Sequence, residues 1–439
     1  MSYINTLTTG TGTLTYYSDV TGNLQLQTDG NILIGMTNSA TGRLVGIGTS
    51  TPAYNLDVVG NVRISGNLTV NGSNGFAFSD GTVQTSAASP YVLKNRIING
   101  DMRIDQRNAG ASVTLTSSNG VFVVDRWTFY NSIGTLTGQQ NAGSVTPPAG
   151  FTNYVGYTVT AAATPSGSNF VSIQQKIEGY NIADLAYGTA NAKTVTLSFW
   201  VYCSKTGTFG GALQNQSNSY SYAFTYSIPS ANIWAFITVT IPGLTTGAQN
   251  TTNGTGLFVV LDLGNGASLN TTPGSWVVGS YQGATGSSNI VSTSGAYYYL
   301  TGVQLEIGTS ATPFERRMYG QELANCQRYY TQSYDYGNVA GTIQRIGAIT
   351  TVAPAAQNFL QLGQSAFPVS MRTTPAITLY NPDTGSSNIT LAIRNYTGSS
   401  NLSASVATVS STSLRVTLNN VASTTDSVYG VHYTASAEL

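Results

Sequence analysis

Residues 55–72 read Asn55-Leu-Asp-Val-Val-Gly60, Asn61-Val-Arg-Ile-Ser-Gly66 and Asn67-Leu-Thr-Val-Asn-Gly72, a six-residue unit repeated three times. Apolar residues alternate with polar ones inside each unit, as they do along a β-strand with one buried face. The Gly-Asn junctions permit tight turns through positive φ. The pattern predicts short strands, and the expected buried face consists of Leu56, Val58, Val62, Ile64, Leu68 and Val70.

One chain does not bury this apolar face by itself. Burial of the six aliphatic side chains contributes less free energy than the ordering of eighteen residues costs in conformational entropy. Three chains wrapped around one axis would bury the apolar face and cover the strand edges that a single chain leaves open. We therefore expect a homotrimeric β-fibre shaft.

Similar short strands precede the repeat, and a linker follows it. Leu24-Gln-Leu and Ile32-Leu-Ile flank the turn Thr28-Asp29-Gly30-Asn31, and Val45-Gly-Ile comes next. The polar stretch 76–90 ends in Ala87-Ala-Ser-Pro90, which is typical of a linker.

Beyond residue 94 the predicted strands become longer and more aromatic, with turns rich in Gly, Asn, Ser and Thr. The clearest are residues 121–124, 194–202, 234–241 and 257–263. Such a series favours a jelly-roll β-sandwich. Residues 319–330 carry the best helical spacing, and strands return at 376–380, 389–393 and 414–418. We interpret this last part as a second, smaller β-sandwich, so the predicted fold class is all-β.

The composition excludes several partners. Only 8% of the residues are charged, and 17 basic residues balance 17 acidic ones. Nucleic acid needs a basic surface, so it is not an expected partner. No apolar stretch is long enough to insert into a membrane, and the opening residues Met1-Ser-Tyr-Ile-Asn-Thr lack the pattern of a secretion signal. Cys203 and Cys326 have no metal-type spacing, and we expect both to be buried thiols.

Several motifs resemble phage tail-fibre proteins. Residues 45–52 followed by Leu56-Asp-Val resemble a shaft repeat, and residues 80–85 resemble the segment that closes such a shaft. Residues 99–107, with Asp125-Arg-Trp127, resemble the opening of a carbohydrate-binding-module-like jelly roll. Gly302-Val-Gln-Leu-Glu306 with Thr312-Pro-Phe-Glu-Arg316 resembles its close. Residues 322–330 and 367–372 resemble the segment that follows.

The resemblance implies a virion protein with four parts. These are attachment to a phage tail or baseplate (1–20), the trimeric shaft (21–90), the jelly roll (91–318) and the C-terminal sandwich (319–439). It implies adhesion to the host through a surface glycan or lipopolysaccharide. A purely structural fibre or decoration protein is the first alternative, and a polysaccharide-degrading fibre enzyme is the second. A bacterial adhesin is disfavoured by the expected lack of a secretion signal.

Sugar binding needs aromatic faces together with amide and hydroxyl groups. Two polar loops supply both, and their candidate ligand-binding residues are Asn215, Gln216, Tyr220, Tyr222, Trp276 and Tyr281. Trp127, Trp200 and Trp234 occur in apolar runs and are expected in the core.

No catalytic residue is assigned, and we expect a protein that is not an enzyme. The single histidine, His432, has no triad partner nearby in the sequence. A glycosidase would need only two carboxylates, and the sequence cannot pair the available ones. They are Asp101, Asp105, Asp125, Glu178, Asp184, Asp262, Glu306 and Glu315. No cofactor is expected; a jelly roll can hold a structural Ca²⁺, but no ligand set is readable here.

Overall fold

The computed structural model of the chain describes most of its residues. The described ranges are 24–28, 31–39, 42–49, 51–66, 75–77, 83–84, 94–116, 118–216, 219–353, 357–387, 392–394, 398–400, 403–421 and 427–439. The expected attachment segment 1–20, and Leu68 and Val70 of the expected shaft face, lie outside them. The chain divides into two compact units, Met1–Ala88 and Ser89–Leu439.

The first unit is built from short strands, most of which lie outside the Gly-Asn repeat at residues 55–72. One sheet has the order β1 (Leu24–Thr28), β2 (Asn31–Ser39), β3 (Gly42–Ile47) and β4 (Leu56–Val58), and β5 (Phe76–Ala77) pairs with β6 (Val83–Gln84). The predicted hairpin is confirmed, because Thr28 pairs with Asn31 in antiparallel register. β4 lies in the first six-residue repeat and runs parallel to β3. The second repeat, residues 61–66, lies within the described residues and forms no strand in the single chain.

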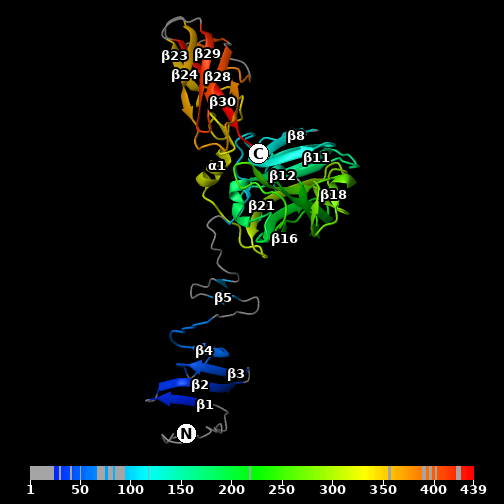
Figure 1. Ribbon diagram of the computed structural model, residues 1–439, viewed down its shortest axis with the longest axis vertical. Helices are drawn as coiled ribbons and strands as arrows, with labels where there is room; N and C mark the ends of the chain where they lie inside the picture. The colour runs from blue at the N-terminus through cyan, green and yellow to red at the C-terminus, as the bar shows by residue number, and fades with distance from the viewer. Residues whose placement is uncertain are drawn as a thin grey trace. The chain divides into compact units, whose positions relative to one another are not determined.

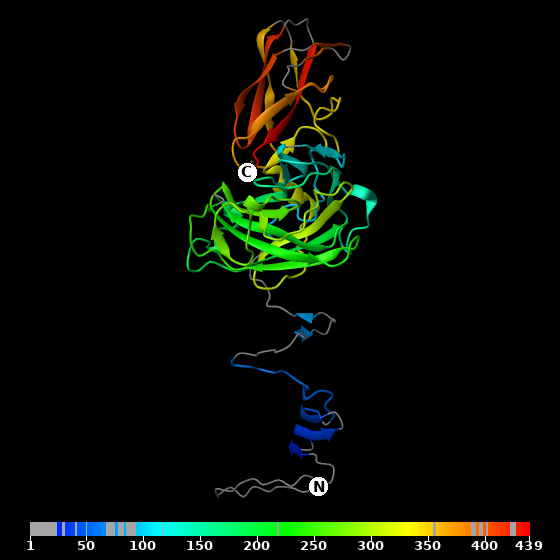
Figure 2. The same cartoon turned by 90° about the vertical axis from the view of Figure 1, so that its right-hand side faces the viewer.

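The second unit begins with a large two-layer β-sandwich (Figures 1 and 2). The six-stranded sheet has the order β16 (Ala235–Ile241), β13 (Val195–Cys203), β21 (Tyr297–Ile307), β11 (Val155–Ala161), β10 (Thr135–Gln140) and β7 (Val113–Leu115). The seven-stranded sheet has the order β19 (Trp276–Val278), β15 (Tyr220–Ile228), β14 (Gly207–Asn215), β17 (Thr255–Asp262), β12 (Val171–Glu178), β9 (Trp127–Asn131) and β8 (Ser118–Val124). One apolar core lies between them and includes Trp127, Phe199 and Leu261.

A short helix follows the sandwich, as the periodicity predicts. α1 spans Tyr319–Gln327, and the fully buried Cys326 lies on its inner face. Tyr330, which the helical spacing included, instead begins strand β22 (Tyr330–Gln332). Cys203 is a buried free thiol on β13, as expected.

The C-terminal part is a second, smaller pair of sheets. In one, β30 (Ser427–Ser436) pairs with β22, β23 (Ile349–Ala353) and β25 (Ala376–Tyr380). The other has the order β24 (Gln357–Ala366), β29 (Ser413–Val421) and β28 (Ser403–Val409), and β26 (Ala392–Arg394) pairs with β27 (Gly398–Ser400). Their shared core contains Leu362, Val416 and Val431. The predicted all-β class is therefore confirmed.

Both ends of the large sandwich are fastened to each other. The backbone N–H of Asn95 donates to the Glu315 carboxylate at 2.5 Å. The Arg317 guanidinium donates to the carbonyls of Asn95 and Ile97. The backbone N–H of Arg96 donates to the carbonyl of Leu305, at 2.9 Å, on the last strand of the sandwich. The chain thus enters and leaves this sandwich at one place, which we call the end clamp (residues 95–97 and 315–317).

Ion pairs and ring contacts join the sandwich to the C-terminal part. The Glu438 carboxylate accepts hydrogen bonds from Arg126 and, at 2.7 Å, from Arg107. Arg126 also lies 3.6 Å from the centre of the Tyr329 ring. The Tyr329 hydroxyl in turn donates to Glu178 on β12 at 2.5 Å. Because most of these groups are buried, each charge depends on its partner across the boundary.

Candidate functional site

The opening motif of the sandwich has a structural role. The Asn99 side chain donates to the carbonyls of Ile104 and Asp125 and accepts from the Ile104 N–H, at 2.8 to 3.0 Å. The Trp127 indole N–H donates to the Asn99 carbonyl at 2.9 Å. Trp127 itself is fully buried, as predicted. This motif therefore builds a buried corner and leaves little of itself for a ligand.

The six predicted ligand-binding residues lie at the β15–β19 edge or beside it. Tyr222 pairs with Trp276 across the two strands, and Tyr222 is only 7% exposed because it belongs to the core. The Trp276 indole N–H donates to the Pro242 carbonyl at 2.7 Å. Tyr220 is half-buried on the same strand, two residues before Tyr222, and packs against the core.

The other three predicted residues lie on or near the ends of β14 and β19, and two of them are held by hydrogen bonds that involve backbone groups. Asn215 is fully buried, and its side-chain Oδ1 accepts the backbone N–H groups of Ser219 and Tyr220. Tyr281 is half-buried and is held through its backbone by Ser221 and Gln214. Gln216 is half-buried in the turn after β14. The structure thus brings Tyr220, Tyr222 and Trp276 together mainly by packing, and a binding role for the six residues stays a prediction.

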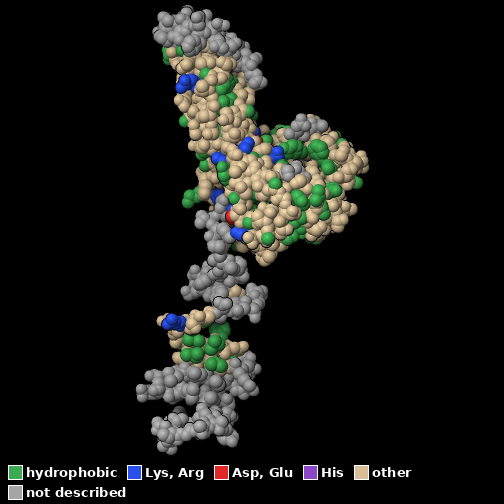
Figure 3. Space-filling model, viewed as in Figure 1, with side chains coloured by type: hydrophobic (Ala, Val, Ile, Leu, Met, Phe, Trp, Pro, Cys, Tyr) green, Lys and Arg blue, Asp and Glu red, His purple; other side chains and the backbone are tan. Residues whose placement is uncertain are grey.

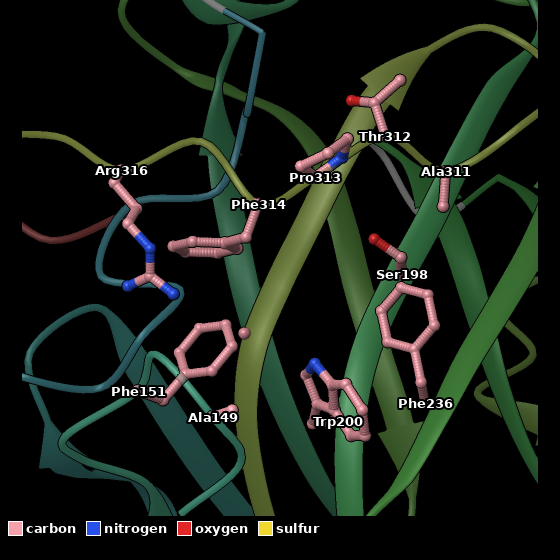
Figure 4. Close-up of a pocket in the computed structure, with 11 residues that line it drawn as sticks. Ala149, Phe151, Ser198, Trp200, Phe236, Ala311, Thr312, Pro313, Phe314 and Arg316 are labelled. Carbon is pink, nitrogen blue, oxygen red and sulfur yellow. The ribbon is translucent and has the colours of Figure 1, made fainter. Parts of the chain in front are cut away.

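A pocket of about 380 Å³ opens elsewhere, on the outer face of the six-stranded sheet (Figure 4). Period-two alternation creates this face. Phe199 and Val201 point into the core, so the intervening Trp200 points outward. Trp200 pairs with Phe236 on the neighbouring β16, with ring centres 5.1 Å apart. Phe236 is 47% exposed, which is unusual for a phenylalanine on a strand of a sandwich.

Two loops complete the pocket walls. Phe151 comes from the segment before β11, and Phe314 comes from the closing motif, with ring centres 5.2 Å apart in an edge-to-face contact. The remaining lining residues are Ala149, Ser198, Gly302, Ala311, Thr312, Pro313 and Arg316. Figure 4 shows the four aromatic side chains around the opening, with the Arg316 guanidinium beside Phe151 and Phe314.

A β-bulge shapes the pocket floor. Ser198 pairs with Gln304 and Trp200 with Thr301, so β21 carries one more residue here than β13. Gly302 lies in this bulge at φ +63°. A Cβ at Gly302 would lie 2.8 Å from the Phe151 ring and 3.0 Å from Trp200. A residue with a Cβ would therefore be strained at this φ and would collide with both rings.

The closing motif holds the upper wall in place. The Glu306 carboxylate, which is 1% exposed, accepts the backbone N–H and the hydroxyl of Thr312 at 2.8 and 2.6 Å. Gln304 donates to the Thr312 carbonyl and accepts the backbone N–H of Glu315. Phe314 is therefore carried on a segment that is fixed on both sides.

More aromatic side chains continue along the same outer face. The Tyr202 ring, two residues beyond Trp200 on β13, stacks on Tyr299 with centres 5.7 Å apart and planes 9° from parallel. Tyr154 stacks on Tyr299 at 5.3 Å, and burial raises the pKa of both. Both phenols therefore keep their protons at neutral pH. Trp234 is half-buried beside them, so the expectation of a core position is wrong for Trp200 and Trp234.

The lone histidine has a structural environment. His432 is fully buried and stacks on Tyr334 with ring centres 3.9 Å apart. Its Nε2 faces the Gln344 carbonyl at 3.0 Å, and its Nδ1 lies 2.8 Å from the Ser333 hydroxyl. A ring nitrogen facing a carbonyl must carry the proton, so Nδ1 accepts from Ser333. Desolvation lowers the pKa of His432, which stays neutral inside this sandwich.

The eight carboxylates that the sequence offers for a glycosidase each have partners within the chain. Asp101 pairs with Arg103 at 3.0 Å, and Glu178 pairs with Arg328 at 2.6 Å. The others accept hydrogen bonds from neighbouring side chains or backbone N–H groups. None of the eight lines the pocket described above. Within the described ranges, no three His, Cys, Asp or Glu side chains gather closely enough to hold a metal ion.

Charged residues are 8% of the chain. Figure 3 shows mostly uncharged polar groups and backbone on the displayed face, with hydrophobic patches and a few separate basic side chains. In the part of the chain that the structure describes, no helix is long and apolar enough to cross a membrane.

Comparison with known proteins gives remote likenesses. No protein-family model matches the sequence, and no curated protein matches it. Among solved structures, the enzymatically active domain of bacteriophage CBA120 tailspike protein 4 matches at 12% identity and a TM-score of 0.27, over 50% of this chain and 22% of that one. The family 11 carbohydrate-binding module from Clostridium thermocellum matches at 10% identity and a TM-score of 0.23, over 46% and 98% of the two chains. A cellulose-binding domain from Cellulomonas fimi matches at 13% identity and a TM-score of 0.23, over 45% and 99%.

Proposed function

We propose that this chain is a subunit of a trimeric phage tail fibre that adheres to the host cell by binding a surface glycan in the pocket of Trp200, Phe236 and Phe314. The observation that carries the proposal is the exposure of aromatic rings at an open pocket on a sheet face. Aromatic faces hold the C–H patches of sugars, and neighbouring polar groups fix their orientation. The Trp200 indole N–H, without a hydrogen-bond partner among the described residues, is one donor available there.

The motif resemblance to phage fibres supports the virion assignment, and the first unit supports the trimer. In the single chain Leu56, Val62 and Ile64 are 61%, 63% and 48% exposed. Exposed aliphatic side chains in a row, next to backbone that forms no strand at residues 61–66, need a covering surface. Two further copies of the same chain would supply it, and many linked heads would add avidity to weak single sites.

Binding, rather than hydrolysis, is favoured by the carboxylates. Burial raises the pKa of Asp125 and Asp262 to about 7, a value suited to a general acid, but both side chains are 2% exposed or less. Neither can reach a polysaccharide. The alternative is a purely structural fibre protein, and the following experiment distinguishes it from a glycan-binding one.

The test is binding of fluorescently labelled full-length protein to a panel of candidate host cells, before and after periodate oxidation of their surface sugars. We expect binding that periodate abolishes. Phe236→Ala should weaken it about tenfold or more, as removal of an aromatic anchor does. Ile233→Ala is the matched control, because Ile233 is 60% exposed and does not line the pocket.

The other outcomes separate the alternatives. Absence of binding to every permissive host would favour the structural fibre. Loss of polysaccharide viscosity on incubation would show an enzyme. Loss of binding in Trp276→Ala with normal binding in Phe236→Ala would move the site to the β15–β19 edge. A sedimentation mass of one chain would contradict the trimer, and Ile64→Asp should lower that mass from three chains to one.

A further inference from the structure

The pocket has one charged group. Of its lining residues only Arg316 is charged, and its side chain is exposed. The guanidinium carbon lies 4.7 Å from the centre of the Phe151 ring and 5.7 Å from that of Phe314. The guanidinium makes no hydrogen bond or ion pair to any residue that the structure describes. Its five N–H donors are therefore available at the pocket rim.

The acidic side chains nearby are already paired. The Arg316 charge acts on the Asp101 carboxyl, but Arg103 is the ion-pair partner of that carboxyl at 3.0 Å. Glu315 accepts from the backbone of Asn95 and lies 3.3 Å from Arg317. The positive charge of Arg316 is thus left uncompensated at the opening.

A glycine sets the position of this guanidinium. Gly150, at φ +83°, precedes Phe151, and a Cβ there would lie 2.8 Å from an Nη atom of Arg316. The guanidinium therefore lies directly against the backbone of the pocket wall. Its position between that backbone and two rings restricts the rotamers of Arg316 before a ligand arrives. Binding therefore costs less side-chain entropy than it would for a freely moving arginine.

We infer that the pocket selects an acidic sugar, with the sugar carboxylate paired to Arg316 and the sugar ring against Trp200 and Phe236. The inference rests on the proposed glycan binding and adds the class of ligand. An arginine fork matches a carboxylate in a two-bond geometry. Aromatic faces are electronegative, so an anion would enter this pocket only where a cation offsets the rings. Arg316 is that cation.

The test uses the full-length protein on a glycan array with matched acidic and neutral members. The pairs are polygalacturonate and its carboxyl-reduced form, sialyllactose and lactose, and bacterial capsular polysaccharides before and after carboxyl reduction. We expect the strongest signals on carboxylated members, at least tenfold above their neutral partners, with a decline as salt is added. Arg316→Gln should remove this preference, and Arg316→Lys should keep part of it.

Two controls make the result specific. Lys205→Gln removes a cation of the same sandwich that does not line the pocket, and it should leave the preference intact. Phe236→Ala should weaken binding to acidic and neutral members alike. Binding to neutral glycans only, or an acidic preference that survives Arg316→Gln, would overturn the inference while the proposed function stands. No binding to any member would overturn both.

Discussion

Replacing Asp262 by asparagine should stabilise the large sandwich at alkaline pH. The carboxyl is 2% exposed at the end of β17, and burial raises its pKa from 3.8 to about 7. One carboxyl oxygen accepts the backbone N–H groups of Gly264 and Asn265 at 2.7 and 2.9 Å. The other faces Gly283 from the same side as the Asn270 side-chain oxygen, which is buried without a hydrogen-bond partner among the described residues. A protonated carboxyl can donate a hydrogen bond there, and so can an amide.

The pKa shift gives the sign and the size of the effect. The folded chain keeps a proton on Asp262 at pH values where the unfolded chain has lost it, so this stabilisation is complete below pH 3.8 and is lost as the pH rises through about 7. Between pH 5 and pH 8 the loss in unfolding free energy is about 2 to 3 kcal/mol. Asp262→Asn has no proton to lose. It should match the parent protein within about 1 kcal/mol at pH 5 and exceed it by about 2 kcal/mol at pH 8.

The assay is urea unfolding of the full chain at both pH values, followed by tryptophan fluorescence. All 4 tryptophans, at positions 127, 200, 234 and 276, lie in the large sandwich, so the signal reports on its core. The pKa of Asp125 is also raised to about 7, but Asp125 is present in both proteins and its contribution cancels. Asp335→Asn is the control, because that side chain is exposed and has no ion pair among the described residues, so it should leave the stability nearly unchanged at both pH values. The reasoning is refuted if the unfolding free energies of Asp262→Asn and the parent differ by the same amount at pH 5 and pH 8. Asp262 would then be ionised in the folded chain at both pH values.

Three further substitutions test other contacts. Tyr298→Phe leaves the buried Tyr226 hydroxyl without the partner that it has at 2.8 Å, and it should cost about 1 to 3 kcal/mol in urea unfolding; adding Tyr226→Phe should recover part of that loss. Glu438→Ala removes the anion beside the buried Arg126, so it should lower the free energy of unfolding by about 3 to 5 kcal/mol and raise hydrogen exchange in α1. Unchanged exchange would contradict the role of this ion pair in docking the C-terminal part. Gly302→Ala, at φ +63°, forces a Cβ to within 2.8 Å of a pocket ring, and it should lower stability by about 1 to 3 kcal/mol and glycan binding with it; normal binding on the array would show that the floor does not shape the site.

The sequence predicted strands better than it predicted the surface they form. Residues 376–380 coincide with β25, and residues 194–202 differ from β13 by one residue at each end, because β-branched and aromatic residues with period-two alternation define a strand locally. The helix ends before Tyr330 because of a contact that is distant in the sequence. Tyr330 has helical spacing, but its backbone pairs with Ser436, near the C-terminus, as part of a β-sheet.

The pocket beside Trp200 and Phe236 was missed for two different reasons. The apolar run around Trp200 suggested burial, although strict alternation with Phe199 and Val201 already placed Trp200 on the opposite face. No local sequence pattern predicts that Phe151 and Phe314 line the same pocket, because they lie on loops 163 positions apart in the sequence. Conversely, the polar residues around Trp276 suggested exposure, but its indole N–H finds the Pro242 carbonyl. Composition indicates which residues can bind a sugar, and only the fold decides which of them are free to do so.

The end clamp has a mechanical consequence. A pull applied to the chain on either side of the large sandwich acts first on the contacts of Asn95 with Glu315 and Arg317, which join the two ends directly. While those contacts hold, they divert most of the load from the strands between them. The sandwich thus lies beside the path of the force and not in it, so a chain pulled at its two ends keeps the pocket largely undistorted. The same arrangement allows the whole sandwich to be exchanged for another between the same two ends without a change in the path along which the load travels.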